Sequence, residues 1–561
     1  MSDAPASGSN RILRSAVRDA VRRALNEAVR AGSLPAPADD RPVDVQRPGN
    51  PEHGDYATNL ALQLARPLRL APSAIATAVA AALGRQGGVI GTAEAAGPGF
   101  VNVRVSDAAL EAIVARARRE PDRWGRLTAD GPARHVNVEF VSANPTGPLT
   151  VGNARGAFVG DLLARVLEAG GQRVTREYYF NDSSAQVRNL GASVLAQREG
   201  RPIPDDGYHG EYVVELAGAL PDELAMPRPG DDHDARAWAA GRWASVRVRE
   251  GIEASLQHLG VRFDVWTTEG SLVSDGWVDQ AIARLRDGGH LYERDGATWF
   301  RSTAFGDDKD RVVVRSNGEL TYFAFDIGYV VQKFSRDFDH LIYIWGADHH
   351  GTVARVRNAA AAMGYDKSRV EMILTGWVHF VRDGVEISMS KRAGTFITLD
   401  ELLADLGVDA ARWYFASRGA NVDIDIDIEL ARRQSTENPV YYVQYAHARI
   451  ASILRKAVES GLAPATSIEG LLAEAPDALL ARVVARFPEI VEDAAAAQET
   501  QGVTTYTTEL ATAFHAYYRD ARVVDPTEPD RSARRLALVD ATRITLAGAL
   551  GLLGISAPEA M

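Results

Sequence analysis

Apolar positions divide the chain into three regions of different texture. Residues 11–31 carry apolar side chains at helical spacing, which predicts an amphipathic helix with Asn10 as its N-cap and a stop at Gly32. Residues 100–105 alternate valine with polar side chains, the pattern of a strand with one buried face. We therefore expect a small α+β domain over residues 1–125.

The middle of the chain alternates between strand and helix patterns up to about residue 406. A strand over residues 136–141, a loop over 142–150 and a helix over 154–169 begin the series. This alternation is typical of an open parallel α/β sheet. A polar stretch rich in proline and aspartate, residues 202–234, breaks it and predicts an insertion around residues 195–275. The whole region predicts one domain over residues 126–430.

Beyond Ala431 the apolar periodicity is helical almost throughout. Helices are predicted over residues 440–458, 475–497, 505–519 and 532–553, which indicates a helical bundle over residues 431–561. Just before it, isoleucines alternate with Asp423, Asp425 and Asp427. The glycine turn and ligand spacing of a calcium loop are missing, so we expect a strand with one acidic face.

Composition narrows the class of protein. A chain of 561 residues is too long for one core. The net charge of −12 argues against binding nucleic acid through bulk charge. The absence of cysteine excludes disulfides, thiolate catalysis and cysteine-ligated metals. With no apolar run of membrane-spanning length and no signal-peptide core, we expect a cytoplasmic protein.

Residues 139–156 form the first cluster that is a candidate for ligand binding. A predicted strand leads into a loop stiffened by Pro145 and Pro148, and a helix follows with Gly152 near its start. A helix N-terminus offers free amides and partial positive charge to an anion, and the glycine lets a nucleotide approach the backbone. Taken alone, an ordinary strand–turn–helix explains this segment equally well.

Residues 387–395 form the second cluster, a polar and cationic loop. Lys391 is placed to neutralise charge on the phosphates of ATP as pyrophosphate leaves. Thr398 then begins a predicted helix as its cap. Taken alone, this segment is more simply a solvated basic loop.

Together the two clusters resemble the HIGH and KMSKS signatures of class I aminoacyl-tRNA synthetases. The segments 140–160, 322–328, 344–351, 389–398 and 438–450 resemble the arginyl-tRNA synthetase family, as do both ends of the chain over 53–64, 99–105 and 533–561. The resemblance implies a multidomain α/β protein. In it a Rossmann-like class I catalytic domain is flanked by a small N-terminal α+β domain that contacts tRNA and a C-terminal all-α anticodon-binding bundle.

The resemblance also implies an activity. ATP, accompanied by Mg²⁺ with no metal site built by the protein, would activate L-arginine as arginyl-adenylate. Transfer to tRNA(Arg) would follow, with release of AMP and pyrophosphate, by an enzyme that is a monomer. Arginine itself calls for acidic acceptors placed for bidentate contact. Tyr322 and Asp326, four apart, share one face of a predicted helix.

The family pattern assigns roles residue by residue. Arginine-binding residues are Glu139, Ser142, Asn144, Tyr322, Asp326 and His349. ATP-binding residues are Pro148, Leu149, Thr150, Gly152, Asn153, Gly346, Asp348, His350, Met389, Ser390 and Lys391. Catalytic residues are Thr150, Gly152, Asn153 and Lys391, and tRNA-binding residues are Tyr441, Tyr445 and Arg449.

The signatures depart from the family pattern at three positions. Thr150 and Asn153 stand where the first motif has histidines, and Ser388 stands where a lysine is common in the second. Threonine and asparagine retain hydrogen-bond donors but do not titrate near neutrality. Loss of one donor to a transition state costs on the order of a hundredfold in rate, and we expect Lys391, Arg392, Arg155 and Mg²⁺ to compensate.

Two alternatives stay open beside the active ligase. One is a catalytically silent paralogue that only binds tRNA or arginine, and the other is a synthetase for another amino acid such as lysine or citrulline. The paired histidines at 349–350 lack further ligands for a metal. The arginine-rich face of the first helix, which includes Arg14, is either solvated or an RNA contact, and solvation is the simpler reading.

Overall fold

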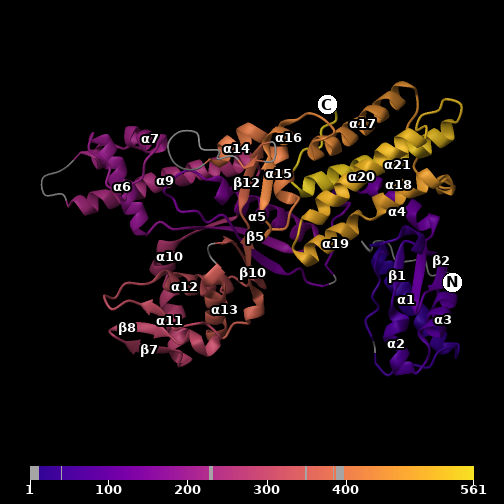
Figure 1. Ribbon diagram of the computed structural model, residues 1–561, viewed down its shortest axis with the longest axis horizontal. Helices are drawn as coiled ribbons and strands as arrows, with labels where there is room; N and C mark the ends of the chain where they lie inside the picture. Colours follow the sequence, from indigo (N-terminus) through magenta and orange to yellow (C-terminus); the bar gives the residue numbers. More distant parts are fainter. Residues whose placement is uncertain are drawn as a thin grey trace.

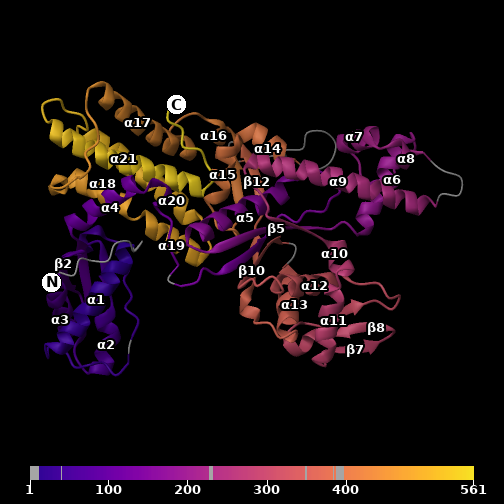
Figure 2. The same ribbon diagram turned by 180° about the vertical axis from the view of Figure 1, so that it is seen from behind.

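A computed structural model describes residues 12–39, 41–129, 131–226, 232–347, 350–382, 385–386 and 397–561. A central α/β region lies beside a long helical bundle, and a small N-terminal domain is attached beneath the bundle (Figure 1). The reverse view shows the same three bodies, with a helical arm projecting from the central region on the side away from the N-terminal domain (Figure 2). None of the described helices has the length and apolar character needed to cross a membrane.

The N-terminal domain is α+β, as predicted. A three-stranded antiparallel sheet, in the order β1-β3-β2, is covered by helices. Its elements are α1 (Leu13–Arg30), β1 (Tyr56–Thr58), α2 (Leu60–Leu68), α3 (Pro72–Gly84), β2 (Ile90–Ala96) and β3 (Phe100–Val105). The predicted cap of the first helix is wrong, because the N-cap position is Ile12. Asn10 lies outside the described residues.

A polar cluster joins this domain to the bundle. The buried carboxylate of Glu489 accepts hydrogen bonds from the Tyr56 hydroxyl and from Arg47 Nε, the latter at 2.9 Å. Arg14 on the first helix donates to Glu492 Oε2 at 3.1 Å and to Asp493 Oδ1 at 2.6 Å. Arg14 therefore belongs to an interdomain contact, which neither a solvated face nor an RNA surface describes.

The central sheet is parallel and has the order β11-β10-β4-β5-β6. The first strand in the sequence, β4, lies in the middle, and the chain winds outward from it first to one side and then to the other. This is the doubly wound arrangement expected of a Rossmann-like domain. The strands are β4 (His135–Glu139), β5 (Arg173–Phe180), β6 (Val265–Thr268), β10 (His340–Gly346) and β11 (Val370–Thr375).

Helices complete this region on both sides of the sheet. α5 (Val151–Ala169) follows β4 and lies close to it, because a Cβ at Gly160 would stand 2.1 Å from the Phe140 ring. α5 begins three residues before the predicted start, so Gly152 lies in its first turn. The other helices are α10 (Glu269–Ser274), α11 (Trp277–Asp287), α12 (Tyr322–Phe334) and α13 (His350–Ala362), with a small sheet of β7 (Leu291–Arg294), β8 (Ala297–Phe300) and β9 (Arg311–Val314).

The projecting arm lies between β5 and β6, where the polar stretch predicted an insertion (Figure 2). It consists of α6 (Ala185–Arg198), α7 (Glu211–Ala219), α8 (Asp222–Ala225) and α9 (His233–Leu259). α6 and α9 cross at two glycines. A Cβ at Gly191 would stand 1.9 Å from the Ala237 carbonyl oxygen, and one at Gly241 would stand 2.1 Å from that of Val187. The crossing therefore requires glycine on both helices.

A second small sheet lies between the central α/β region and the bundle along the chain. The predicted acidic strand forms β14 (Ile424–Asp427), which pairs in parallel with β12 (Val378–Arg382). β13 (Val385–Glu386), α14 (Leu399–Leu406), α15 (Val408–Ala416) and α16 (Ile428–Arg432) complete this part. No cluster of metal-ligating side chains occurs among the described residues, so the aspartates remain a strand face there.

The C-terminal region is helical, as predicted. Its helices are α17 (Pro439–Glu459), α18 (Ala475–Ala485), α19 (Phe487–Ala497), α20 (Gln501–Asp520) and α21 (Pro529–Leu552), and α4 (Asp107–Arg119) packs against α18 and α21. The single helix predicted over residues 475–497 is wrong. The chain breaks at Arg486, two residues before Pro488, which lacks the amide needed to continue a helix.

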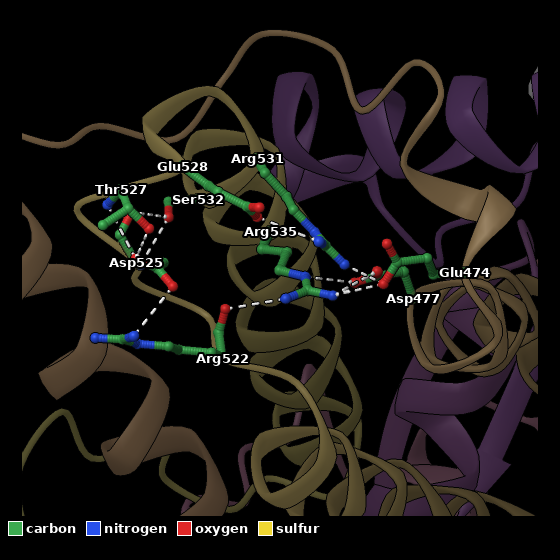
Figure 3. A network of polar contacts seen from close by, with 9 residues as sticks. All are labelled: Glu474, Asp477, Arg522, Asp525, Thr527, Glu528, Arg531, Ser532 and Arg535. Carbon is green, nitrogen blue, oxygen red and sulfur yellow. Dashed lines mark hydrogen bonds and ion pairs between the residues drawn. The ribbon is translucent and has the colours of Figure 1, made fainter.

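A buried ion pair holds one end of the bundle together (Figure 3). Arg535 on α21 donates to both oxygens of Asp477 on α18, at 3.2 and 3.1 Å, and its Nη1 donates to the Arg522 carbonyl at 3.1 Å. Asp477, fully buried, also accepts from the Tyr517 hydroxyl at 2.7 Å. The pair thereby fixes the connection between α20 and α21 to α18.

Candidate functional site

The principal cavity opens where the winding of the central sheet changes direction. The sheet order places β4 beside β10, so the chain leaves these two neighbours in opposite directions and a crevice forms beyond their carboxyl ends. A cavity of about 840 Å³ lies there. It contains predicted residues from both strands and from α5 and α12: Glu139, Ser142, Asn144, Gly152, Asn153, Tyr322, Asp326 and Gly346.

Several predicted residues lie elsewhere. In the described part of the chain, Pro148, Leu149 and Thr150 are absent from the cavity lining, and Leu149 is buried. Asp348, His349, Met389, Ser390 and Lys391 lie outside the described residues, as does the side chain of His350. Tyr441, Tyr445 and Arg449 lie on α17 in the bundle, away from the cavity, as their predicted role requires.

A strained turn after β4 shapes the cavity wall. Val141 and Ser142 both adopt left-handed conformations, with φ of 67° and 42°. Each such non-glycine residue costs roughly 1–3 kcal/mol. Hydrogen bonds hold the turn: Ser142 Oγ donates to Glu139 Oε1 at 3.1 Å and accepts from the Tyr179 amide at 3.1 Å. The turn brings Asn144 back to the cavity instead of continuing the strand.

Thr150 and Asn153 form a reciprocal cap at the start of α5. The Asn153 amide donates to Thr150 Oγ1, and Asn153 Oδ1 accepts from the Thr150 amide and hydroxyl, the hydroxyl at 2.9 Å. The expectation that Thr150 supplies a free hydroxyl donor is therefore corrected, because that hydrogen is used inside the cap. The Asn153 side-chain NH₂ forms no hydrogen bond within the described residues, and Asn153 lines the cavity.

A second cap is joined to the first. Thr398 caps α14 with Glu401 in the same reciprocal way. The backbone on either side connects the two: the Val151 amide donates to the Ile397 carbonyl at 2.9 Å, and the Leu399 amide donates to that of Leu149 at 2.8 Å. The chain that follows the second cluster, from residue 397 on, is thus anchored at the start of α5.

Arg155 contacts backbone carbonyls and no phosphate-binding surface. Its guanidinium is buried and donates to the carbonyls of Trp377, Gly419, Ala420 and Val422. Burial lowers the pKa of Arg155 to about 10, with Asp423 opposing the shift. The expectation that Arg155 compensates at the phosphates is therefore wrong. It fixes the backbone of Trp377, whose exposed ring lines the cavity mouth.

The inner end of the cavity is acidic. Asp326 lines it and forms no hydrogen bond or ion pair within the described residues. Burial, then the negative charges of Glu139 and Glu269, raise the pKa of Asp326 to about 7, although Arg355 opposes them. Glu269 is buried and accepts hydrogen bonds from the Tyr179 hydroxyl and Ser183 Oγ, both at 2.7 Å. Neither Asp326 nor Glu269 is neutralised by a described cation.

Several residues in and behind the cavity wall were not predicted. Tyr329 and Lys333 continue the face of α12 that carries Tyr322 and Asp326, and both positions were available from the same helical spacing. Trp377, which lines the cavity, and Glu269, which accepts a hydrogen bond from the lining residue Tyr179, carried no such signal. Each is a single residue far along the chain, placed by the pairing of β12 with β14 and of β5 with β6.

Thr150→Val is expected to lower the rate of any ATP-dependent reaction here about fivefold, because loss of an N-cap hydroxyl costs ~1 kcal/mol. Thr150→Ser retains the hydroxyl and serves as the matched control, with near-normal activity. Steady-state kinetics at saturating and limiting ATP measure the effect. Equal losses in the two variants would show that the cap does not support the site.

Comparisons with known proteins cover almost the whole chain. Family models match residues 15–105 (arginyl tRNA synthetase N terminal domain), 233–427 (tRNA synthetases class I (R), catalytic domain) and 443–561 (DALR anticodon binding domain). The arginine--tRNA ligase of Bacillus licheniformis is 42% identical over 556 residues, which is 97% of this chain and 99% of that protein.

Solved structures agree with the sequence comparisons. The Thermus thermophilus arginyl-tRNA synthetase superimposes with a TM-score of 0.76 at 25% identity, over 98% of this chain and 100% of that chain. The Plasmodium falciparum arginyl-tRNA synthetase has the same fold, with a TM-score of 0.73 at 15% identity over 99% and 100% of the two chains.

Proposed function

The chain belongs to the arginyl-tRNA synthetase family and ligates arginine to tRNA(Arg), and from this premise we propose that the cavity at the carboxyl ends of β4 and β10 binds arginine and ATP and forms the adenylate between them. The observation that carries the assignment is the acidic inner end. Asp326 lines this end and forms no hydrogen bond or ion pair with a described residue, and Glu269 adds negative charge behind it. A planar guanidinium with five donors supplies the charge and the hydrogen bonds that Asp326 lacks.

The other end of the cavity suits the nucleotide. Gly152 lines it, and a Cβ there would meet only Thr150 Oγ1, at 3.6 Å, so the backbone is open to a close approach. The amides of Val151 and Asn153 are used within the caps, so the N-terminus of α5 offers phosphate oxygens its partial positive charge and the Gly152 amide, and the NH₂ of Asn153 adds a donor. We assign Gly346, Met389, Ser390, Lys391, Asp348 and His350 to ATP and His349 to arginine on the family pattern. The described residues contain no cluster of metal ligands, so Mg²⁺ would arrive with the triphosphate.

The chemistry follows from positioning. A carboxylate oxygen of arginine attacks the α-phosphorus of ATP, and pyrophosphate leaves. A ribose hydroxyl of the terminal adenosine of tRNA then attacks the carbonyl carbon of the adenylate, and AMP leaves. Holding the reactants in line and stabilising the developing charge supply most of the acceleration in such reactions. The turn at Val141–Ser142 and the linked caps fix the position of the arginine end of the cavity relative to the ATP end.

Arginine-dependent exchange of ³²P-pyrophosphate into ATP, run with and without tRNA, tests this assignment. We expect exchange with arginine and little with lysine or citrulline. Absence of exchange and of tRNA charging under both conditions would identify a silent paralogue. Lysine or citrulline charging as efficient as arginine charging would point to a synthetase for another amino acid.

We assign residues 1–125 and 431–561 to tRNA contact and residues 126–430 to catalysis. On α17 the rings of Tyr441 and Tyr445 stack at 6.4 Å, and Arg449 lies over Tyr445 and, at 4.3 Å, over Tyr518. Partly exposed rings with an arginine suit the stacking of unpaired bases. We expect the enzyme to act as a monomer in the cytoplasm.

Tyr445→Ala is expected to raise the KM for tRNA about tenfold, since stacking of one base on an aromatic ring contributes ~1–3 kcal/mol. The KM for ATP stays unchanged, because α17 is remote from the cavity. Aminoacylation kinetics with varied tRNA measure the change. Leu479→Ala, which alters an exposed side chain on α18, is the control and leaves both constants unchanged. A KM for tRNA that stays normal in Tyr445→Ala would exclude this ring from the tRNA surface.

A further inference from the structure

A fully buried lysine lies directly beneath the arginine end of the cavity. Lys333 is the last of four residues on one face of α12, after Tyr322 at the mouth, Asp326 on the wall and buried Tyr329. Its Nζ lies 2.6 Å from Glu139 Oε2. The same nitrogen lies 4.3 Å from the ring centre of Tyr329 and 3.8 Å from that of Tyr343. A charged side chain with no exposure is rare unless a partner holds it.

The pairing divides the acidic groups around the cavity into two kinds. Glu139 has Lys333 as its cation, and Glu177, deeper in the sheet, has Arg336 at 2.8 Å. Asp326 and Glu269 have no ion pair in the part of the chain that the structure describes. The charge of Glu139 is therefore compensated within the protein, and that of Asp326 is not paired with a described cation. Arginine has the complementary asymmetry, with a zwitterionic α-carbon end and a guanidinium that needs a counter-charge.

We propose that Lys333 is a positioning residue for the substrate: it holds the Glu139 carboxylate oriented for the α-ammonium of arginine, and it leaves Asp326 to take the guanidinium. The inference rests on the proposed function of the cavity. Both Glu139 oxygens are fixed, one by Lys333 and the other by Ser142 Oγ at 3.1 Å. The orientation of the carboxylate is thus determined before arginine enters.

The surroundings explain why a cation is needed. Burial raises the pKa of Glu139, and Glu177 adds to the shift, while Lys333 and Ser142 oppose it. The other groups facing this centre are Tyr179 of β5, Glu269 of α10, Asp326 and Tyr329 of α12, Tyr343 of β10 and Arg336 beyond α12. Burial lowers the pKa of Lys333, which the two glutamates oppose. Without Lys333, the largest opposition to the upward shift of the Glu139 pKa would be lost.

Lys333→Met tests the inference, because methionine keeps most of the volume and removes the charge. We expect the KM for arginine in pyrophosphate exchange to rise about tenfold at pH 7, because Glu139 loses both a contact that orients it and the cation that opposes the upward shift of its pKa. The KM for ATP stays normal. The defect diminishes as the pH rises, because a higher pH favours the ionised form of a carboxylate whose pKa is raised.

An analogue of arginine separates positioning from general damage. 5-Guanidinopentanoate has the guanidinium and carboxylate but no α-amino group. Its inhibition constant should be the same in Lys333→Met as in the unaltered enzyme, because it makes no use of Glu139. An equal loss for arginine and for this analogue would overturn the proposal, because it would mean that the whole pocket had been disturbed.

Coupling to Glu139 provides the second criterion. In a Glu139→Gln background, Lys333→Met should change the KM for arginine less than twofold, since the group through which it acts is gone. The same tenfold factor in both backgrounds would overturn the inference. Arg286→Met, which removes an exposed cation in the last turn of α11, is the control and leaves the KM for arginine unchanged. If Lys333→Met does not fold, Lys333→Gln carries the same criteria.

Different results would reject the proposed function of the cavity and the proposed role of Lys333. A normal KM for arginine in Glu139→Gln would remove arginine from this end of the cavity, and with it the proposed function of Glu139. A raised KM in Glu139→Gln together with a normal KM in Lys333→Met at pH 7 would leave the cavity assignment standing and reject the role of Lys333.

Discussion

Asp326→Asn is expected to lower kcat/KM for arginine about a thousandfold, with the KM for ATP unchanged. The amide keeps the volume of the carboxylate but loses its charge and presents an NH₂ to a guanidinium that only donates. Removing one partner of a desolvated charge pair costs ~2–5 kcal/mol, and a thousandfold corresponds to about 4 kcal/mol. Pyrophosphate exchange at varied arginine measures the loss. Asp287→Asn, an exposed carboxylate at the end of α11, is the control and retains full activity.

The same residue predicts a pH dependence for the unaltered enzyme. With a pKa of about 7 in the empty cavity, Asp326 is largely protonated below neutrality and binds the guanidinium poorly there. The KM for arginine should therefore fall as the pH rises through 7, and this slope should disappear in Asp326→Asn. A KM that is flat between pH 6 and 8 in the unaltered enzyme would contradict the assignment.

The stability of the arginine-free protein depends on pH in the opposite direction. The pKa of Asp326 is raised from an ordinary value of 3.8, so the folded state holds the proton more tightly than the unfolded chain does. Stability from this group is full at acidic pH and declines as the pH rises towards 7. Arginine binds the ionised form and offsets the loss, so its thermal protection should be greater at pH 8 than at pH 6. Melting curves with and without arginine measure the difference.

Local periodicity was sufficient to predict much of the architecture. The alternation that begins at His135 predicted a parallel α/β region, and the doubly wound order confirms it, because strand–helix–strand units pack in few ways. The boundary of α5 was missed because its cap is formed by Thr150 and Asn153 together, and the cap brings Gly152 into the first turn. The break at Arg486 was missed because apolar residues continue at helical spacing past Pro488.

For the candidate site, the sequence predicted relations within one element and missed those that the fold assembles. Helical spacing placed Tyr322 and Asp326 on one face of a helix, and the family resemblance supplied their predicted role in binding arginine. The role of Arg155 was misjudged because its guanidinium is held by four backbone carbonyls of residues 377 and 419–422, which are far from it in the sequence. Sequence shows that an arginine is present near a motif, but burial and the direction of its side chain decide whether it binds a ligand or the protein's own backbone.

The buried pair of Arg412 and Asp161 predicts the largest effect on stability. Arg412 on α15 is fully buried and bonds to Asp161 on α5. It also donates to two helix ends, the Leu553 carbonyl beyond α21 at 2.7 Å and the Leu259 carbonyl of α9 at 3.0 Å. One guanidinium therefore joins the catalytic helix, the projecting arm and the bundle. A Cβ on Gly554 would stand 2.2 Å from its Nη2, so the chain passes close against it.

Arg412→Met is expected to destabilise the protein by ~3–5 kcal/mol, because it leaves a buried carboxylate and two carbonyls without their donor. Arg165→Met is the matched control. Arg165 bonds to the same carboxylate at 2.7 Å but is about one-third exposed, so its loss costs ~1 kcal/mol or less. Urea unfolding followed by circular dichroism compares the two. The double variant Arg412→Met with Asp161→Asn distinguishes two origins of the cost. If the cost arises from the unpaired buried charge, removing that charge recovers part of the stability. If it arises from packing alone, the losses of the two single variants add.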